Sequence, residues 1–219
     1  MRSTTVMRAV LALAFAGLPV APADAQEPAH RAHIAHLADA FSGTPEGRGL
    51  VPTARAEAEI VVRHATLAAG DPANLDAIKL HVGHVLHAVD PTAMTAGPGL
   101  GYGVKQAAEG AERHAKLVWD DEEAPRQARW YAERVTVSVR NTVERADSIA
   151  SLAVRIREAT TAEAAAELLD ELTAVTDVLI PGDDANNDNG IGWRRGEGGL
   201  EVTRQYLEVL KRVAAPSDP

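Results

Sequence analysis

The sequence predicts an all-α protein, a bundle of six to seven helices, from its composition and from the signals that end each apolar segment. Aromatic residues make up only 4% of the chain, alanine is abundant and β-branched runs are short, which is typical of helices. Gly, Pro, Asn and Asp separate the apolar segments. The chain contains no cysteine, which excludes disulfides, thiolate metal sites, iron–sulfur clusters and covalently attached c-type haem.

Seven segments are expected to be helical. Thr53, Asn74 and Thr161 are expected N-caps, because their side chains accept hydrogen bonds from the first helical amides. The expected helices cover residues 30–41, 53–69, 74–89, 104–119, 125–159, 161–180 and 200–213. The fifth is unusually long and is expected to break near Asn141. Its arginines are interpreted as a solvated face with intrahelical ion pairs; they are Arg126, Arg129, Arg134, Arg140 and Arg145.

The first 25 residues have the pattern of a secretory signal peptide. Arg2 and Arg8 supply positive charge, residues 9–20 are apolar, and Ala23-Asp24-Ala25 is a cleavage site of small residues. The apolar stretch is too short for a stable membrane span. We therefore expect residues 1–25 to be removed and the mature chain to be periplasmic or secreted, with no membrane insertion after cleavage.

Cleavage would leave 194 residues, enough for one large domain or two small ones. We expect a histidine-rich part, residues 26–124, and a part of C-terminal helices, residues 125–219, within one continuous globular unit. The formal charge of −9 would become −10. An acidic surface argues against nucleic acid and anionic lipid as partners and is compatible with attracting cations.

The histidines form two matching sets. Each set has a triplet spaced H-x-x-H-x-x-H, followed by one further histidine. The first set is His30, His33, His36 and His64, and the second is His81, His84, His87 and His114. Imidazole is the commonest protein ligand for borderline transition metals. The eight histidines are therefore all candidate metal ligands.

The two sets belong to an internal repeat. A shift of 51 residues superimposes the triplets, and a shift of 50 superimposes Arg63-His64-Ala65 on Arg113-His114-Ala115. We interpret residues 29–69 and 80–119 as two copies of a helical hairpin. A lone hairpin cannot bury its apolar face, so the copies are expected to pack as a four-helix bundle.

Helix geometry limits how one triplet binds a metal. Residues three apart are neighbours on a helix, whereas the first and third members of a triplet lie about 120° apart around the axis. Each triplet therefore offers at most two ligands per ion. We expect His64 and His114, on the second helices of their own units, to supply further ligands, completed by Asp90, Glu109 or Glu112. Such a site suits copper, zinc, nickel or ferrous iron.

Residues 184–197 resemble an EF-hand calcium loop. Asp184, Asn186 and Asp188 match its first, third and fifth ligand positions. Asn189 stands where glycine is usual, and Arg195 stands where the bidentate glutamate belongs, with Glu197 two residues later. The resemblance implies calcium binding by Asp184, Asn186, Asp188 and Glu197.

Residues 29–119 as a whole are similar to the histidine-rich periplasmic small metal-binding proteins. The similarity rests on His33-x-x-His36, on His81-x-x-His84-x-x-His87 and on the two Arg-His-Ala segments. It implies a helical bundle that sequesters divalent metals, copper among them.

The sequence therefore predicts a metal-binding protein for sequestration, buffering or delivery, and not an enzyme. It does not carry the two helical Glu-x-x-His pairs of ferritin-like di-iron sites, nor H-E-x-x-H or G-x-S-x-G. Two alternatives stay open at this point. One is a bis-histidine haem bundle, with His84 or His87 facing His114. The other is a calcium-binding interaction module. The sequence does not identify a protein partner.

Overall fold

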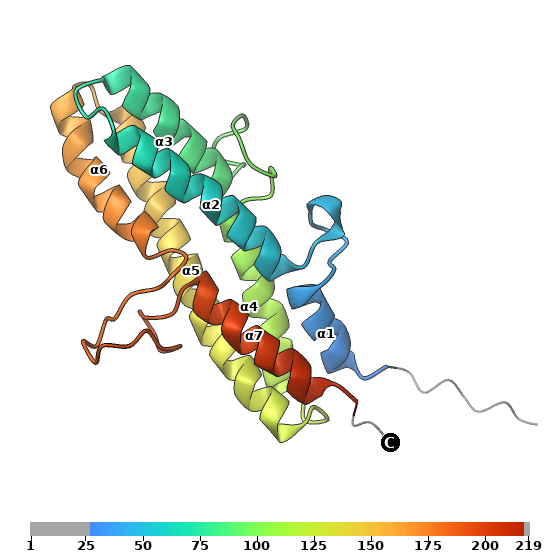
Figure 1. Cartoon of the computed structure of the whole chain (residues 1–219). Helices are drawn as coiled ribbons and strands as arrows, with labels where there is room; N and C mark the ends of the chain where they lie inside the picture. The colour runs from blue at the N-terminus through green and yellow to red at the C-terminus, as the bar shows by residue number, and fades with distance from the viewer. Residues whose placement is uncertain (1–26, 217–219) are drawn as a thin grey trace, which may run out of the picture.

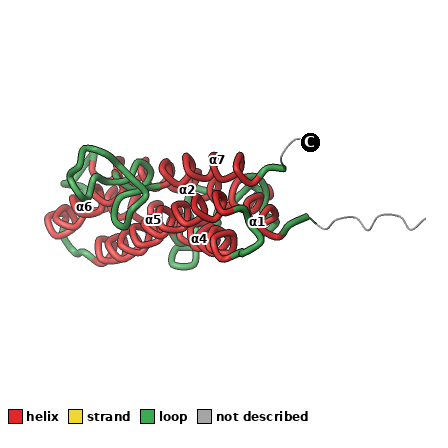
Figure 2. The backbone as a smooth tube through the Cα atoms, turned by 90° about the horizontal axis from the view of Figure 1, so that it is seen from below, coloured by secondary structure: helices red, strands yellow, loops and turns green. Residues whose placement is uncertain are grey.

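The computed structural model describes residues 27–216, and every regular element in this range is a helix (Figures 1 and 2). The helices are α1 (Ala29–Ala38), α2 (Leu50–Ala69), α3 (Leu75–Val89), α4 (Val104–Asp120), α5 (Arg126–Glu158), α6 (Ala162–Asp177) and α7 (Leu200–Ala214), with a short 3₁₀ helix, η1 (Pro45–Gly47). The predicted all-α bundle is confirmed. Within these residues, no helix is long and apolar enough to cross a membrane. The predicted signal peptide, residues 1–25, lies outside the described residues.

Two of the three predicted N-caps are confirmed. The side chains of Asn74 and Thr161 accept hydrogen bonds from the amides of Ala77 and Ala164. Thr53 is not a cap, because α2 begins three residues earlier, at Leu50. Pro52 therefore lies in the first turn, where its missing N–H costs no intrahelical hydrogen bond.

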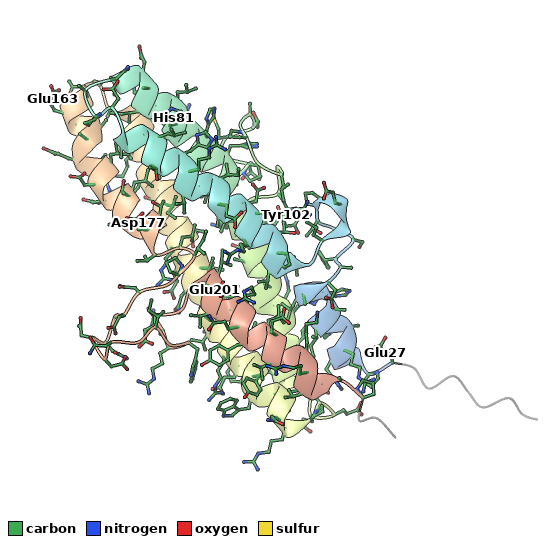
Figure 3. All side chains as sticks on the ribbon, in the orientation of Figure 1. Glu27, His81, Tyr102, Glu163, Asp177 and Glu201 are labelled. Carbon is green, nitrogen blue, oxygen red and sulfur yellow. The ribbon has the colours of Figure 1, made fainter. Side chains whose placement is uncertain are left out.

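The buried apolar residues form two clusters, one at each end of the molecule. One cluster comes mainly from α2, α3, α6 and the C-terminal part of α5. The other comes mainly from α1, α4, α7 and the N-terminal part of α5. We call these the α2–α3 half and the α1–α4 half. Helix α5 runs the length of the bundle and serves both halves, and Tyr102 packs against both clusters near the middle (Figures 1 and 3).

The first four helices pair differently from the prediction. Helix α1 packs mainly on α4, and α2 packs mainly on α3, whereas α1 with α2 and α3 with α4 have few contacts. The loop lengths give the reason. Only residues 70–74, between α2 and α3, form a loop short enough for a tight antiparallel turn, while residues 39–49 and 90–103 carry the chain farther. The two sequence repeats therefore exchange helices instead of forming separate hairpins.

Helix α5 is continuous, and Asn141 anchors a loop instead of breaking the helix. Its side chain donates to the carbonyl of Arg194 and accepts from the amide of Gly196. Arg145 donates to three carbonyl groups of the same loop, and Arg134 is buried against the rings of Trp130 and Trp193. These two arginines contradict the expected solvated face, because the loop of residues 178–199 folds back over α5.

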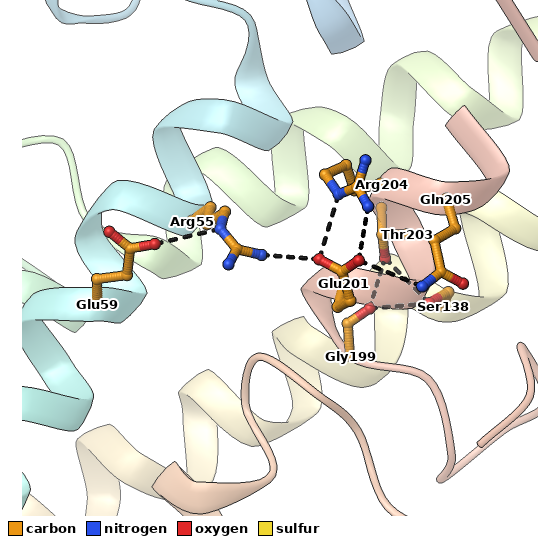
Figure 4. A network of polar contacts seen from close by, with 8 residues as sticks. All are labelled: Arg55, Glu59, Ser138, Gly199, Glu201, Thr203, Arg204 and Gln205. Carbon is orange, nitrogen blue, oxygen red and sulfur yellow. Dashed lines mark hydrogen bonds and ion pairs between the residues drawn. The ribbon is translucent and has the colours of Figure 1, made fainter. Parts of the chain in front are cut away.

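A polar network links α2 to α7 (Figure 4). The carboxylate of Glu201 accepts from Arg55 of α2 at 3.0 Å and from Arg204 of its own helix at 2.6 Å. Hydrogen bonding from Arg204 is the main cause that lowers the pKa of Glu201 to about 2. Since α2 and α7 belong to different halves, this network helps to hold the halves together.

Candidate metal centres

Six of the eight histidines gather into two groups of three. Site 1 consists of His33, His36 and His114, and site 2 consists of His64, His81 and His84. In each site, one ring nitrogen per histidine lies within 4.8 Å of the other two. All six side chains are half-buried, so both sites are reached from solvent.

Site 1 joins the first helix to the fourth. His33 and His36 are neighbours on one face of α1, and His114 comes from α4. The Nδ1 atoms of His33 and His114 are 3.0 Å apart. Phe41, which the sequence analysis did not single out, packs its ring against His36 and His114 at centroid distances of 5.3 and 5.4 Å. The Nδ1 atom of His36 is buried and has no hydrogen-bond partner. A buried ring nitrogen without a partner is the condition that a metal ion would relieve.

Site 2 joins the second helix to the third. His81 and His84 are neighbours on α3, and His64 comes from α2, which runs beside it (Figure 3 labels His81). The Nδ1 atom of His64 lies 3.2 Å from that of His81 and 3.3 Å from that of His84. Three ring nitrogens thus converge on one point, with the lone histidine as their common neighbour.

These separations match those of ligands around one ion. In a tetrahedral site with metal–nitrogen bonds of about 2.0–2.1 Å, two ligand nitrogens are roughly 3.3 Å apart. The three Nδ1 pairs given above, at 3.0, 3.2 and 3.3 Å, are close to that distance. Each group of three histidines could therefore hold one metal ion.

The surroundings favour the neutral imidazole that metal binding needs. Burial lowers the pKa of His114 from 6.5 to about 4, with smaller contributions from the other rings of site 1 and from Arg113. Burial also lowers the pKa of His33, His64 and His84, helped in each case by neighbouring histidines. A lowered pKa favours the neutral imidazole, which is the form that binds a metal ion.

The other two predicted ligands, His30 and His87, lie outside both sites and are buried. Nδ1 of His30 is 3.3 Å from a carboxylate oxygen of Asp121, and Nδ1 of His87 is 2.6 Å from the carbonyl oxygen of Met94, which accepts its hydrogen bond. The 120° turn between the first and third members of a triplet directs one of them away from the ion.

The lone histidines serve the opposite repeats from those expected. His64 meets the triplet of the second repeat, and His114 meets that of the first. The two triplets also match differently in space than in sequence. His33 and His36 have the same role in site 1 as His81 and His84 in site 2, so equivalent residues are 48 positions apart instead of the 51 of the sequence repeat. The prediction was wrong because it paired the two helices of the same repeat, whereas packing pairs helices of different repeats, α1 with α4 and α2 with α3.

No carboxylate completes either site among the described residues. The carboxylate of Asp90 accepts from Thr92, and that of Glu112 accepts from Arg140 at 2.7 Å. The haem alternative loses its proposed axial pairs, since His114 lies in site 1 whereas His84 lies in site 2 and His87 in neither. Both sites thus offer three imidazoles and no fourth histidine, aspartate or glutamate from the described part of the chain.

The loop of residues 184–197 brings several of its predicted calcium ligands together. The side-chain amide of Asn186 donates to Asp188 at 3.0 Å and to Glu197 at 2.6 Å. The carboxylate of Asp184 accepts from the amides of Asp188 and Asn189. No three carboxylates of the loop lie within ligand distance of one another. Calcium binding there stays a prediction.

Comparisons with protein-family models, with curated proteins and with solved structures found no match for this chain. The two three-histidine sites are therefore the features of the chain from which a function can be inferred.

Proposed function

We propose that this chain is a non-catalytic metal-binding protein that sequesters, buffers or delivers a divalent transition metal, with two three-histidine sites per chain. The single observation that carries the proposal is the convergence of three imidazoles twice in one fold, at sites 1 and 2. The predicted signal peptide, residues 1–25, adds the expectation that the protein works in the periplasm or outside the cell.

The donor set supports a transition metal. Three neutral nitrogens suit copper, zinc, nickel or ferrous iron, whereas calcium and magnesium need oxygen ligands. An all-imidazole site is also open to solvent here, because the six rings are half-buried. Closed four-ligand sites are typical of structural metals, whereas three protein ligands leave the fourth position of the ion to solvent. An incoming ligand can use that position to take over the metal, as buffering and delivery require.

The test is metal stoichiometry. Apo-protein is titrated with Zn²⁺ and, separately, with Cu²⁺, and bound metal is measured by calorimetry and elemental analysis. We expect two equivalents for the unaltered chain, and one for either His64→Ala or His114→Ala. The double variant is expected to bind neither ion. Removal of a residue that only hydrogen-bonds to a metal ligand lowers metal affinity about 10- to 100-fold, and removal of the ligand itself is expected to lower it further.

His30→Gln and His87→Asn are the matched controls. Both remove a histidine of the same triplets that lies outside the sites, so both variants are expected to keep two equivalents. Loss of one equivalent in either control, or two equivalents in His64→Ala and His114→Ala, would contradict the assignment. A protein that binds only calcium would contradict the function.

A further inference from the structure

We infer that each site binds a small anion, such as a carboxylate, as a fourth ligand directly on the metal. This inference rests on the proposed function, because it concerns the coordination position that the three histidines leave vacant. It adds a ligand class to the proposed metal sites.

The first step is the ligand count. Each site offers three imidazoles, and no fourth histidine, aspartate or glutamate of the described residues joins them. A tetrahedral ion held by three protein ligands takes its fourth ligand from solvent. The half-buried rings leave that position accessible.

The second step is charge. A divalent ion held by three neutral rings keeps its full charge of +2. Each repeat adds an arginine next to its lone histidine, Arg63 before His64 and Arg113 before His114. Both arginines are exposed, and within the described residues neither forms a salt bridge. An anionic fourth ligand is therefore favoured over a neutral one.

The two sites differ in this respect. Asp121 lies close to site 1. Its carboxylate contacts His30, and its charge raises the pKa of His33 against the larger lowering by burial and by His36. Its negative charge opposes that of Arg113. In site 2 the pKa of His64 is lowered by burial, by His84 and His81 and by Arg63, and the pKa of His84 is lowered by burial and by His81 and His87, with no carboxylate of the described residues among these causes. Anions are therefore expected to bind site 2 more tightly than site 1.

The experiment uses the full chain loaded with Co²⁺, whose visible bands report the ligands of the ion, and azide as the anionic probe. His114→Ala retains site 2 alone, and His64→Ala retains site 1 alone. We expect azide to shift the cobalt bands of both variants in a saturable titration, with a lower apparent Kd for site 2.

Adding Arg63→Ala to the site 2 variant is expected to weaken azide binding roughly two- to fivefold, the range of one exposed charge. The affinity for imidazole, a neutral probe, should not change in this variant. Arg212→Ala, which removes an exposed arginine of α7 in the other half, is the matched control and should leave azide binding unchanged. The effect of Arg63 should shrink at high salt.

The failures are distinguishable. Cobalt that does not bind would overturn the proposed function and this inference with it. Cobalt that binds at two equivalents but whose bands do not respond to azide would overturn the inference alone. An equal azide affinity with and without Arg63 would overturn the charge argument.

Discussion

The two candidate metal sites each consist of three histidines but are assembled over very different distances in the chain. In site 2, His64 meets residues only 17 and 20 positions later, across the short loop between α2 and α3. In site 1, the contact between His33 and His114 spans 81 positions. Site 1 also has Phe41 against two of its rings and a buried nitrogen without a partner, and the described residues around site 2 show neither feature.

The difference shows what a local hairpin can supply and what it cannot. Two adjacent antiparallel helices place His64 beside His81 and His84 with little help from the rest of the fold. Helix α1 is short, and its place beside α4 depends on long-range packing. Site 1 is therefore expected to respond more strongly to changes in the fold, and a metal ion bound there is expected to stabilise the fold more than one bound at site 2.

The largest expected effect concerns the loop that separates α3 from α4. Glu57 of α2 is fully buried, and its carboxylate accepts hydrogen bonds from the amides of Leu100, Tyr102 and Gly103. The corresponding residue of the other repeat, at a shift of 50, is Ala107. Glu57→Gln is expected to lower the free energy of unfolding by about 3 kcal/mol, because buried amides lose a charged acceptor.

Urea unfolding of the apo-protein measures this change. The exposed Glu59 on the same helix is the control, and Glu59→Gln should change stability by no more than about 0.5 kcal/mol. Equal effects of the two substitutions would show that the loop does not depend on Glu57.

The second prediction separates the sites by their action on α1. With zinc at site 1 only, in the His64→Ala variant, amide exchange in residues 29–38 should slow about 100-fold when free zinc is 100 times Kd, or about 2.7 kcal/mol. With zinc at site 2 only, in His114→Ala, exchange in α1 should change little. Hydrogen exchange with mass spectrometry measures both variants, and equal protection of α1 would contradict this difference.

The third prediction concerns the loss of folding stability at acid pH. The folded pKa of His114 is about 4 and its unfolded value is 6.5, so the unfolded state binds more protons between these values. The stability contributed by the neutral ring is complete above pH 6.5 and is lost as the pH falls to about 4. The free energy of unfolding of His114→Gln should therefore fall by about 1 kcal/mol less than that of the unaltered chain over this pH range, after allowance for solvent screening. Urea unfolding of the apo-protein from pH 7 to pH 4 measures it, and an unaltered pH dependence would contradict it.

The smallest expected effect concerns the junction between the halves. Glu201→Gln weakens the contacts with Arg55 and Arg204, and should cost about 1 kcal/mol or less, since the pair is partly exposed. The folded pKa of about 2 lies below the ordinary 4.5, so this stability is present above pH 4.5 and is lost as the pH falls towards 2. Thermal unfolding at pH 7 and pH 3 measures it, with Glu208→Gln as the exposed control.

The sequence predicted the helices well and the pairing of the helices poorly. All seven expected helices exist, and their ends differ by a few residues where a proline or a loop decides the boundary. The restriction to two ligands per triplet followed from helix geometry alone and agrees with both sites. Phe41, Asp121 and Glu57 gave no signal, because their roles depend on residues far away in the chain.

Composition, spacing and turn residues by themselves determined an all-α chain with repeated histidine pairs on helical faces, since these depend on local geometry. Only the tertiary structure decided that the repeats exchange helices, that His114 joins His33 and His36, and that His30 and His87 are left out. The physical reason is that the partner of a helix is chosen by loop length and by apolar burial over the whole molecule. No pattern within one helix records that choice.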